Sequence, residues 1–208
     1  MSKEAHPVLP EEIEARSFAI IAAELGHLSL PEEYTPVVKR VIHATADFEY
    51  ARSLHFSPGV VPAALRALKE GRHIVTDTTM AAAGINKSAL AAFGGEVHCL
   101  IGDPDVARSA LERGTTRSRA AVDKAAAMWP DAIYVVGNAP TALIRIVELV
   151  REARLEPAFV VAVPVGFVNV VESKEAVLLG KTPCIVARGR KGGSNIAAAI
   201  CNALLKMT

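Results

Sequence analysis

The sequence predicts an α/β fold, doubly wound around a mainly parallel five-stranded sheet and preceded by N-terminal helices. Five short apolar runs are rich in β-branched residues and lack strict apolar–polar alternation, which is typical of strands buried on both faces. Helical segments separate these runs, and such alternation indicates parallel strands joined by crossover helices. The 208 residues suffice for one full-sized core, so we expect a single domain over residues 1–208.

Two helices are expected at the start of the chain. The first runs from Pro10 to Gly26, with a buried stripe formed by Ile13, Ser17, Ile20 and Ile21. The second begins at Thr35, where a hydroxyl and then a proline favour a helix start, and the stretch extends to Arg52. The apolar face of this second helix consists of Val37, Val38, Val41, Ile42 and Thr45.

The remaining elements follow in order. Residues 53–71, SLHFSPGVVPAALRALKEG, indicate a turn and a further helix closed by Gly71. The predicted strands are HIVTDT (73–78), EVHCLI (96–101), AIYVVG (132–137), AFVVAVPVG (158–166) and PCIVARG (183–189). The helical segments between and after them are MAAAGINKSALAAFG, DPDVARSALERG, TRSRAAVDKAAAMW, TALIRIVELVREAR, ESKEAVLLG and SNIAAAICNALLK.

Composition excludes several classes of function. Lys and Arg total 23 against 22 Asp and Glu, so the net charge of +1 provides no basic field for nucleic acid or a membrane surface. The three cysteines are widely spaced and form no C-x-x-C pair, which argues against disulfides and structural zinc and favours the cytoplasm. The beginning of the chain, MSKEAHPVLPEEIEA, is not expected to be a signal peptide, and no apolar run is long enough to span a bilayer.

His43 is the candidate acid–base residue. It lies on the polar face of the second helix with Asp47 one turn later, so the carboxylate could orient the imidazole. An oriented imidazole is the usual form of a general acid–base, and the alternative is a histidine on a solvated helix face. For Ser17 the alternatives are a ligand contact and a hydroxyl bonded back to its own helix.

Polar and glycine-rich loops follow the predicted strands, where ligands bind in doubly wound folds. In the last loop, GRKGGSN, the cations Arg190 and Lys191 and the backbone at Gly193 and Ser194 could surround an anion at a helix start. The alternative is a plain capped turn, and the loop matches neither the P-loop nor the dinucleotide fingerprint. A second pair of cations, Arg117 and Arg119, also lies at a helix start and could hold a carboxylate or be solvated.

No metal site is expected, because five histidines lack ligand spacing with one another and with the cysteines: His6, His27, His55, His73 and His98. The sequence also lacks the nucleophile elbow G-x-S-x-G. A substrate with several carboxylates, transformed by acid–base chemistry, fits these observations best.

Several segments together resemble the precorrin-8X methylmutase family of cobalamin biosynthesis. They are IEARSFAII (13–21), VIHA (41–44), HFSPG (55–59), TDTTMAAAGI (76–85), TRSRAA (116–121), GNAPTAL (137–143), PVGFVNVVESKEAV (164–177) and ARGRKGGSNIAAAICNAL (187–204). They occur in order and cover nearly the whole chain, and the motifs are specific in combination although each alone is weak.

The resemblance implies a homodimeric isomerase without a cofactor. It would shift a methyl group on ring C of precorrin-8X, or of its cobalt form, to the adjacent carbon and yield hydrogenobyrinate or cobyrinate. His43 would be the catalytic proton donor. The residues that the resemblance implies for substrate binding are Ser17, Arg117, Asn86 and the adjacent Lys87. Some members of the family have threonine at the position of Asn86. The cations and backbone amides of the last loop would bind the substrate as well.

Two other functions remain open at this level. One is a corrinoid-binding carrier that has the same cleft but performs no chemistry. The other is a nucleotide- or phosphosugar-binding α/β enzyme that uses the GRKGGSN loop.

Overall fold

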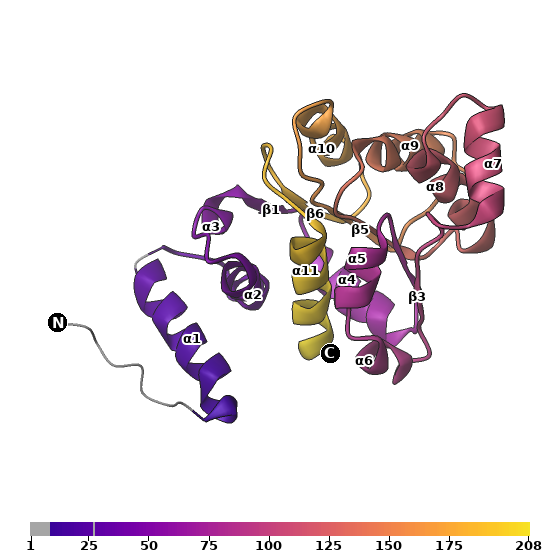
Figure 1. Cartoon of the computed structure of the whole chain (residues 1–208). Helices are drawn as coiled ribbons and strands as arrows, with labels where there is room; N and C mark the ends of the chain where they lie inside the picture. The colour runs from indigo at the N-terminus through magenta and orange to yellow at the C-terminus, as the bar shows by residue number, and fades with distance from the viewer. Residues whose placement is uncertain (1–8, 27) are drawn as a thin grey trace.

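The protein folds around a six-stranded sheet with helices on both faces (Figure 1). The structure, a computed structural model, describes residues 9–26 and 28–208, so His6, His27 and the start of the chain lie outside the described residues. The strands are β1 (Leu54–Phe56), β2 (Ile74–Thr76), β3 (Val97–His98), β4 (Ile133–Val136), β5 (Phe159–Ala162) and β6 (Cys184–Ala187).

The strand order is β1-β6-β5-β4-β2-β3. All neighbouring pairs are parallel except β1 with β6, which is antiparallel. The chain leaves β2 towards β3 at one edge and returns to β4 on the other side of β2. The adjacent ends of β2 and β4 are therefore the topological switch point, where doubly wound folds bind ligands.

One face of the sheet is covered by α2 (Thr35–Thr45), α4 (Val60–Lys69), α5 (Thr79–Gly84), α6 (Lys87–Ala91) and α11 (Ser194–Lys206). The other is covered by α8 (Arg117–Met128), α9 (Pro140–Arg151) and α10 (Val170–Leu178), with α7 (Pro104–Glu112) packed on α8. Strand β4 contributes Ile133 and Val135 to the first core and Tyr134 and Val136 to the second. The prediction of buried strands is thus confirmed for β2, β4, β5 and β6, whereas β3 at the edge of the sheet is only half-buried.

The prediction of five strands is one short. The sequence predicts a turn where β1 lies, because the three residues of this strand are too few to show a strand pattern beside the proline and glycine that follow. The predicted helix at 80–94 is also two short helices, α5 and α6, separated at Ile85 and Asn86.

The predicted buried stripe of the first helix is wrong at two positions. Helix α1 (Pro10–Leu25) packs on α2 at the periphery of the protein, far from the sheet (Figure 1). Ile21 is buried, but Ile13 and Ile20 are 51% and 53% exposed. Part of the apolar face of α1 is therefore left uncovered by the rest of the chain.

The long helical stretch predicted from Thr35 to Arg52 is interrupted. Helix α2 ends at Thr45 because Ala46 adopts the left-handed conformation, with φ 54°. Residues 46–49 form a turn before the short helix α3 (Tyr50–Ser53). No described helix is long and apolar enough to cross a membrane.

Candidate active site

The loops at the carboxyl edge of the sheet form one connected surface. The Thr78 hydroxyl after β2 lies 2.7 Å from the Ser194 hydroxyl at the start of α11. The N–H of Gly193 donates to the carbonyl of Val163, after β5, at 2.8 Å. We call this the carboxyl-edge surface, formed by residues 77–79, 137–139, 164–167 and 188–194.

Asp77 holds this surface together at the switch point. Its carboxylate accepts hydrogen bonds from the backbone N–H groups of Gly137 (2.8 Å), Asn138 (2.8 Å) and Ala139 (2.6 Å). The residue is only 7% exposed. Burial raises the pKa of Asp77, and the three N–H bonds oppose that shift because they favour the ionised form. The carboxylate thus fixes the start of the GNAPTAL segment against β2.

The last loop is supported from below by Lys174, a residue that the sequence analysis missed. Its side chain extends from α10, is fully buried, and donates from Nζ to the carbonyls of Gly189 and Lys191, both at 2.8 Å. Burial lowers the pKa of Lys174 to about 8. A lysine in a helical ESK segment resembles a surface residue, and only the fold shows that it points inward.

We expect Lys174 to give the protein a distinctive pH dependence of stability. From about pH 8 to its ordinary pKa of 10.5, the unfolded chain retains a proton that the folded chain has lost. The free energy of unfolding should therefore rise with pH in this window, by about 2–3 kcal/mol.

The measurement is urea unfolding at pH 7.5 and pH 10 for the wild type and Lys174→Met. All other titrating groups are the same in the two proteins, so their effects cancel in the comparison. The free energy of unfolding of the wild type should therefore rise relative to that of the variant between pH 7.5 and pH 10. A difference that stays constant between the two pH values would contradict the assignment.

Glycine at position 192 is required by packing. A Cβ there would lie 2.2 Å from the Val163 carbonyl oxygen, so the loop can pass over the end of β5 only without a side chain. Gly193 has φ 142°, which also favours glycine. The backbone at Gly192 therefore lies against the protein's own backbone at Val163 and Pro164.

The two cations of the loop have different surroundings. Arg190 is exposed, with its guanidinium 5.5 Å from the ring centroid of exposed Phe167. Lys191 donates to the carboxylates of Asp47 (2.6 Å) and Glu49 (2.7 Å), which raise its pKa. Arg190 is thus the cation of this loop that faces outward without an acidic partner among the described residues.

His43 is exposed on α2, but Asp47 does not orient it. Because α2 ends at Thr45, Asp47 lies in the following turn and binds Lys191 instead. The imidazole stacks on Phe18 of α1, with ring centroids 5.3 Å apart and planes 15° apart. The predicted His43–Asp47 pair is wrong, and packing against an aromatic ring takes its place.

Helix α1 is fixed beside His43 by ionic contacts. The Arg40 guanidinium lies 4.7 Å from the Phe18 centroid and donates to Glu14 at 2.6 Å. The hydrogen bond from Arg40, together with one from Lys206, lowers the pKa of Glu14 to about 2. The hydroxyl of Ser17, one residue before Phe18, donates to the Ile13 carbonyl at 2.8 Å. Of the two alternatives for Ser17, the structure therefore shows the hydroxyl bonded back to its own helix.

Asn86 and Lys87 lie away from the carboxyl-edge surface. Asn86 caps α6 by accepting from the Ala89 N–H at 3.1 Å, and its own N–H donates to the Asn202 side chain near the end of α11. Lys87 is the exposed first residue of α6.

Arg117 is exposed at the first position of α8, on the opposite face of the sheet from His43. The preceding Thr116 hydroxyl donates to Thr141 in the first turn of α9 at 2.9 Å, which places Arg117 beside the GNAPTAL segment. Arg119 forms a double hydrogen bond with Glu148, so of the two cations only Arg117 is left to hold a substrate carboxylate.

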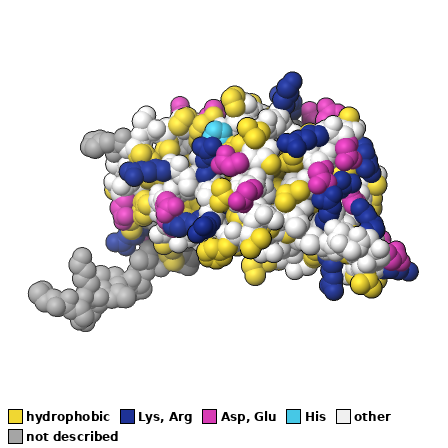
Figure 2. Space-filling view, turned by 90° about the horizontal axis from the view of Figure 1, so that it is seen from above, with side chains coloured by type: hydrophobic (Ala, Val, Ile, Leu, Met, Phe, Trp, Pro, Cys, Tyr) yellow, Lys and Arg dark blue, Asp and Glu magenta, His cyan; other side chains and the backbone are white. Residues whose placement is uncertain are grey.

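The structure therefore brings together Arg190, Lys191, Gly193 and Ser194, with Arg117 along the same edge. The turn that follows the helix of His43 contacts this surface through Asp47 and Lys191, whereas Asn86 and Lys87 form a separate group. Figure 2 shows basic and acidic side chains intermixed on one face, in agreement with the neutral composition. The arrangement offers separated cations and an exposed imidazole.

Comparisons with known proteins give one consistent result. The sequence profile of the precorrin-8X methylmutase family matches residues 12–207. The cobalt-precorrin-8 methylmutase of Salmonella typhimurium is 48% identical over 203 residues, covering 94% of each chain. The precorrin-8X methylmutase of Pseudomonas aeruginosa is 38% identical over 196 residues, covering 93% of this chain and 94% of the relative.

A solved structure shares the fold. The structure of precorrin-8X methyl mutase from Thermus thermophilus superposes with a TM-score of 0.86 at 43% identity, covering 94% of this chain and 96% of that one.

Proposed function

Because the chain belongs to the precorrin-8X methylmutase family, isomerases of cobalamin biosynthesis, we propose that it moves a methyl group within a tetrapyrrole and that His43 supplies the proton. The family match over residues 12–207 carries this proposal. Methyl migration within one molecule needs no methyl donor, and a proton on the macrocycle draws electron density and eases the migration. An exposed imidazole next to the carboxyl-edge surface suits this task.

The substrate is a large polycarboxylate, which the separated cations of the protein would hold. Arg190 and Arg117 lie along the carboxyl-edge surface, and each could form a charge-assisted hydrogen bond to a carboxylate. Exposed Phe167, which is 81% accessible beside Arg190, adds an apolar surface for the macrocycle.

We expect Arg117→Ala to weaken substrate binding about 10–100-fold, because a hydrogen bond to a charged group contributes about 1.5–3 kcal/mol. The free energy of unfolding should change by about 0.5 kcal/mol or less, since Arg117 is exposed. Titration of the substrate by absorbance and urea unfolding measure the two effects. Arg108→Ala, at an exposed position of α7, is the matched control. Equal affinities for Arg117→Ala and Arg108→Ala would remove Arg117 from the site.

We propose that the active site is completed in a homodimer. In one subunit Arg117 lies on the opposite face of the sheet from His43, and Asn86 and Lys87 form a separate group. Helix α1, beside His43, exposes Ile13 and Ile20, which a second copy could cover. Exposed apolar side chains gathered on one element commonly mark an interface.

Size-exclusion chromatography with light scattering tests the dimer. The wild type should have the mass of two chains, and Ile20→Glu should shift it to one because a buried carboxylate disfavours association. Leu111→Glu, at an exposed leucine of α7, is the control and should remain dimeric. A monomeric wild type, or a dimeric Ile20→Glu, would contradict the proposed interface.

The reaction itself is tested by incubating the protein with precorrin-8X and, in parallel, with its cobalt form. The proposed function predicts conversion of at least one, followed by absorbance. Binding without conversion would favour a carrier. Thermal stabilisation by nucleotides but not by a corrinoid would favour a nucleotide-binding enzyme.

A further inference from the structure

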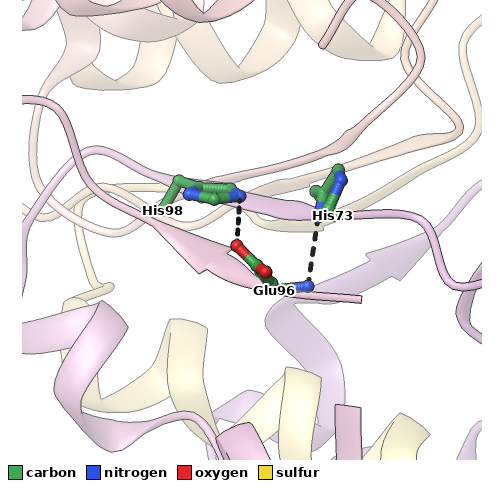
Figure 3. A group of neighbouring side chains, drawn as sticks. All are labelled: His73, Glu96 and His98. Atoms are coloured by element: carbon green, nitrogen blue, oxygen red, sulfur yellow. Dashed lines mark hydrogen bonds and ion pairs between the residues drawn. The ribbon is translucent and has the colours of Figure 1, made fainter. Parts of the chain in front are cut away.

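A group of histidine and carboxylate side chains lies at the amino edge of the sheet, opposite the carboxyl-edge surface. Strands β2 and β3 pair in parallel, with Ile74 opposite Val97 and Val75 opposite His98. The same register brings His73, just before β2, alongside Glu96, just before β3. Figure 3 shows the side chains of His73, Glu96 and His98 gathered at this point.

These three side chains have the spacing of metal ligands. One donor atom from each lies within 4.8 Å of the others, and the Nε2 atom of His98 is 3.6 Å from a carboxylate oxygen of Glu96. Ligand atoms about 2.0–2.2 Å from a tetrahedral zinc ion are about 3.4 Å apart, so small side-chain movements would complete the geometry.

His98 is held in place by stacking, but its ring nitrogen Nε2 is not satisfied by a hydrogen bond within the part of the chain that the structure describes. Its ring stacks on Trp129 of the α8 C-terminus, with centroids 3.9 Å apart and planes 13° apart. The Nε2 atom is buried and has no hydrogen-bond partner among the described residues. Buried polar atoms in folded proteins are normally satisfied, so this atom indicates a missing ligand.

We propose that His73, Glu96 and His98 bind one divalent transition-metal ion of the zinc type. Two imidazoles and one carboxylate are a donor set typical of zinc, whereas magnesium and calcium prefer oxygen ligands only. The Glu96 side chain is 70% exposed, so water can reach a fourth coordination position.

The His73 ring is engaged in one interaction that the metal would change. Its Nδ1 atom accepts a hydrogen bond from the Glu96 backbone N–H at 3.1 Å. A bond between an imidazole and a transition metal is much stronger than one neutral hydrogen bond, so a modest turn of the ring is compatible with binding.

The ion would join β2 to β3 at the edge of the sheet. Strand β3 has two residues and, within the described part of the chain, pairs only with β2, so a ligand shared by both strands would stabilise the folded state. This role does not involve any cobalt that the substrate carries, and it does not depend on the methyl-transfer reaction.

Titration of chelator-treated protein with Co²⁺, a visible-absorbing probe, followed by Zn²⁺ competition, tests the site. We expect one Co²⁺ per chain with ligand-field absorption, displacement by Zn²⁺, and a Zn²⁺-dependent rise in Tm. Glu96→Gln and His98→Gln should each weaken binding at least about tenfold, because even changes to residues that only hydrogen-bond to a metal ligand have effects of this size. His55→Gln, an exposed histidine of β1, is the control and should bind like the wild type.

If His98→Gln fails to fold, Glu96→Gln still tests the site. The Glu96 side chain is exposed, so this variant should fold. The proposal is overturned if the wild type binds no Co²⁺, or if Glu96→Gln binds as tightly as the wild type and the Zn²⁺-dependent rise in Tm persists in it.

Discussion

Replacing His43 by glutamine should reduce kcat for methyl migration by about 10²–10⁴-fold, the usual contribution of a general acid. Glutamine can still donate a hydrogen bond, but it cannot transfer a proton to the macrocycle. Because His43 is exposed and contacts its surroundings mainly by stacking on Phe18, the variant should fold normally and still bind substrate. The measurement is a single-turnover assay followed by absorbance, with substrate affinity determined separately.

The control is His55→Gln, which removes an exposed imidazole from β1 and should turn over at the wild-type rate. Circular dichroism and a urea titration establish that both variants are folded. Wild-type turnover by His43→Gln would exclude His43 as the proton donor, even if the protein is shown to be a methylmutase.

The layers of the fold could be predicted from the sequence because a strand that is buried on both faces is a continuous apolar run. The strands β4, β5 and β6 are continuous apolar runs, and each lies within its predicted range. Strand β1 carries no such signal: three residues at the antiparallel edge look like part of a turn.

The errors about His43 and α1 have physical causes outside the local pattern. Helical spacing placed Asp47 one turn after His43, but Ala46 in the left-handed conformation ends the helix between them. Ile13 and Ile20 have the spacing of a buried stripe, yet α1 lies on α2 at the periphery. Apolar periodicity indicates that a face is to be covered, without indicating whether the same chain covers it.

Two features of the sites depend on tertiary structure. Lys174 supports the last loop across 15 and 17 residues of sequence, so no short motif links them. His73 and His98 have no ligand spacing in the sequence, and strand pairing brings them together from positions that are distant in the chain. Spacing rules detect clusters on one helix or loop but not those that a parallel sheet assembles.

Asp77→Asn should lower the free energy of unfolding by about 1–3 kcal/mol. The carboxylate accepts three backbone N–H groups with two oxygens, whereas an amide has one oxygen, which can accept the two N–H groups that share Oδ2, and it points its NH₂ group at the third. Each buried donor left unsatisfied costs about 1–3 kcal/mol. Urea unfolding at pH 7 measures the loss, and Glu112→Gln, at an exposed carboxylate at the end of α7 that forms no ion pair with the described residues, should change stability by about 0.5 kcal/mol or less. Equal stabilities for the two variants would show that residues 137–139 hold their conformation without the buried charge, and that the switch point is fixed by packing alone.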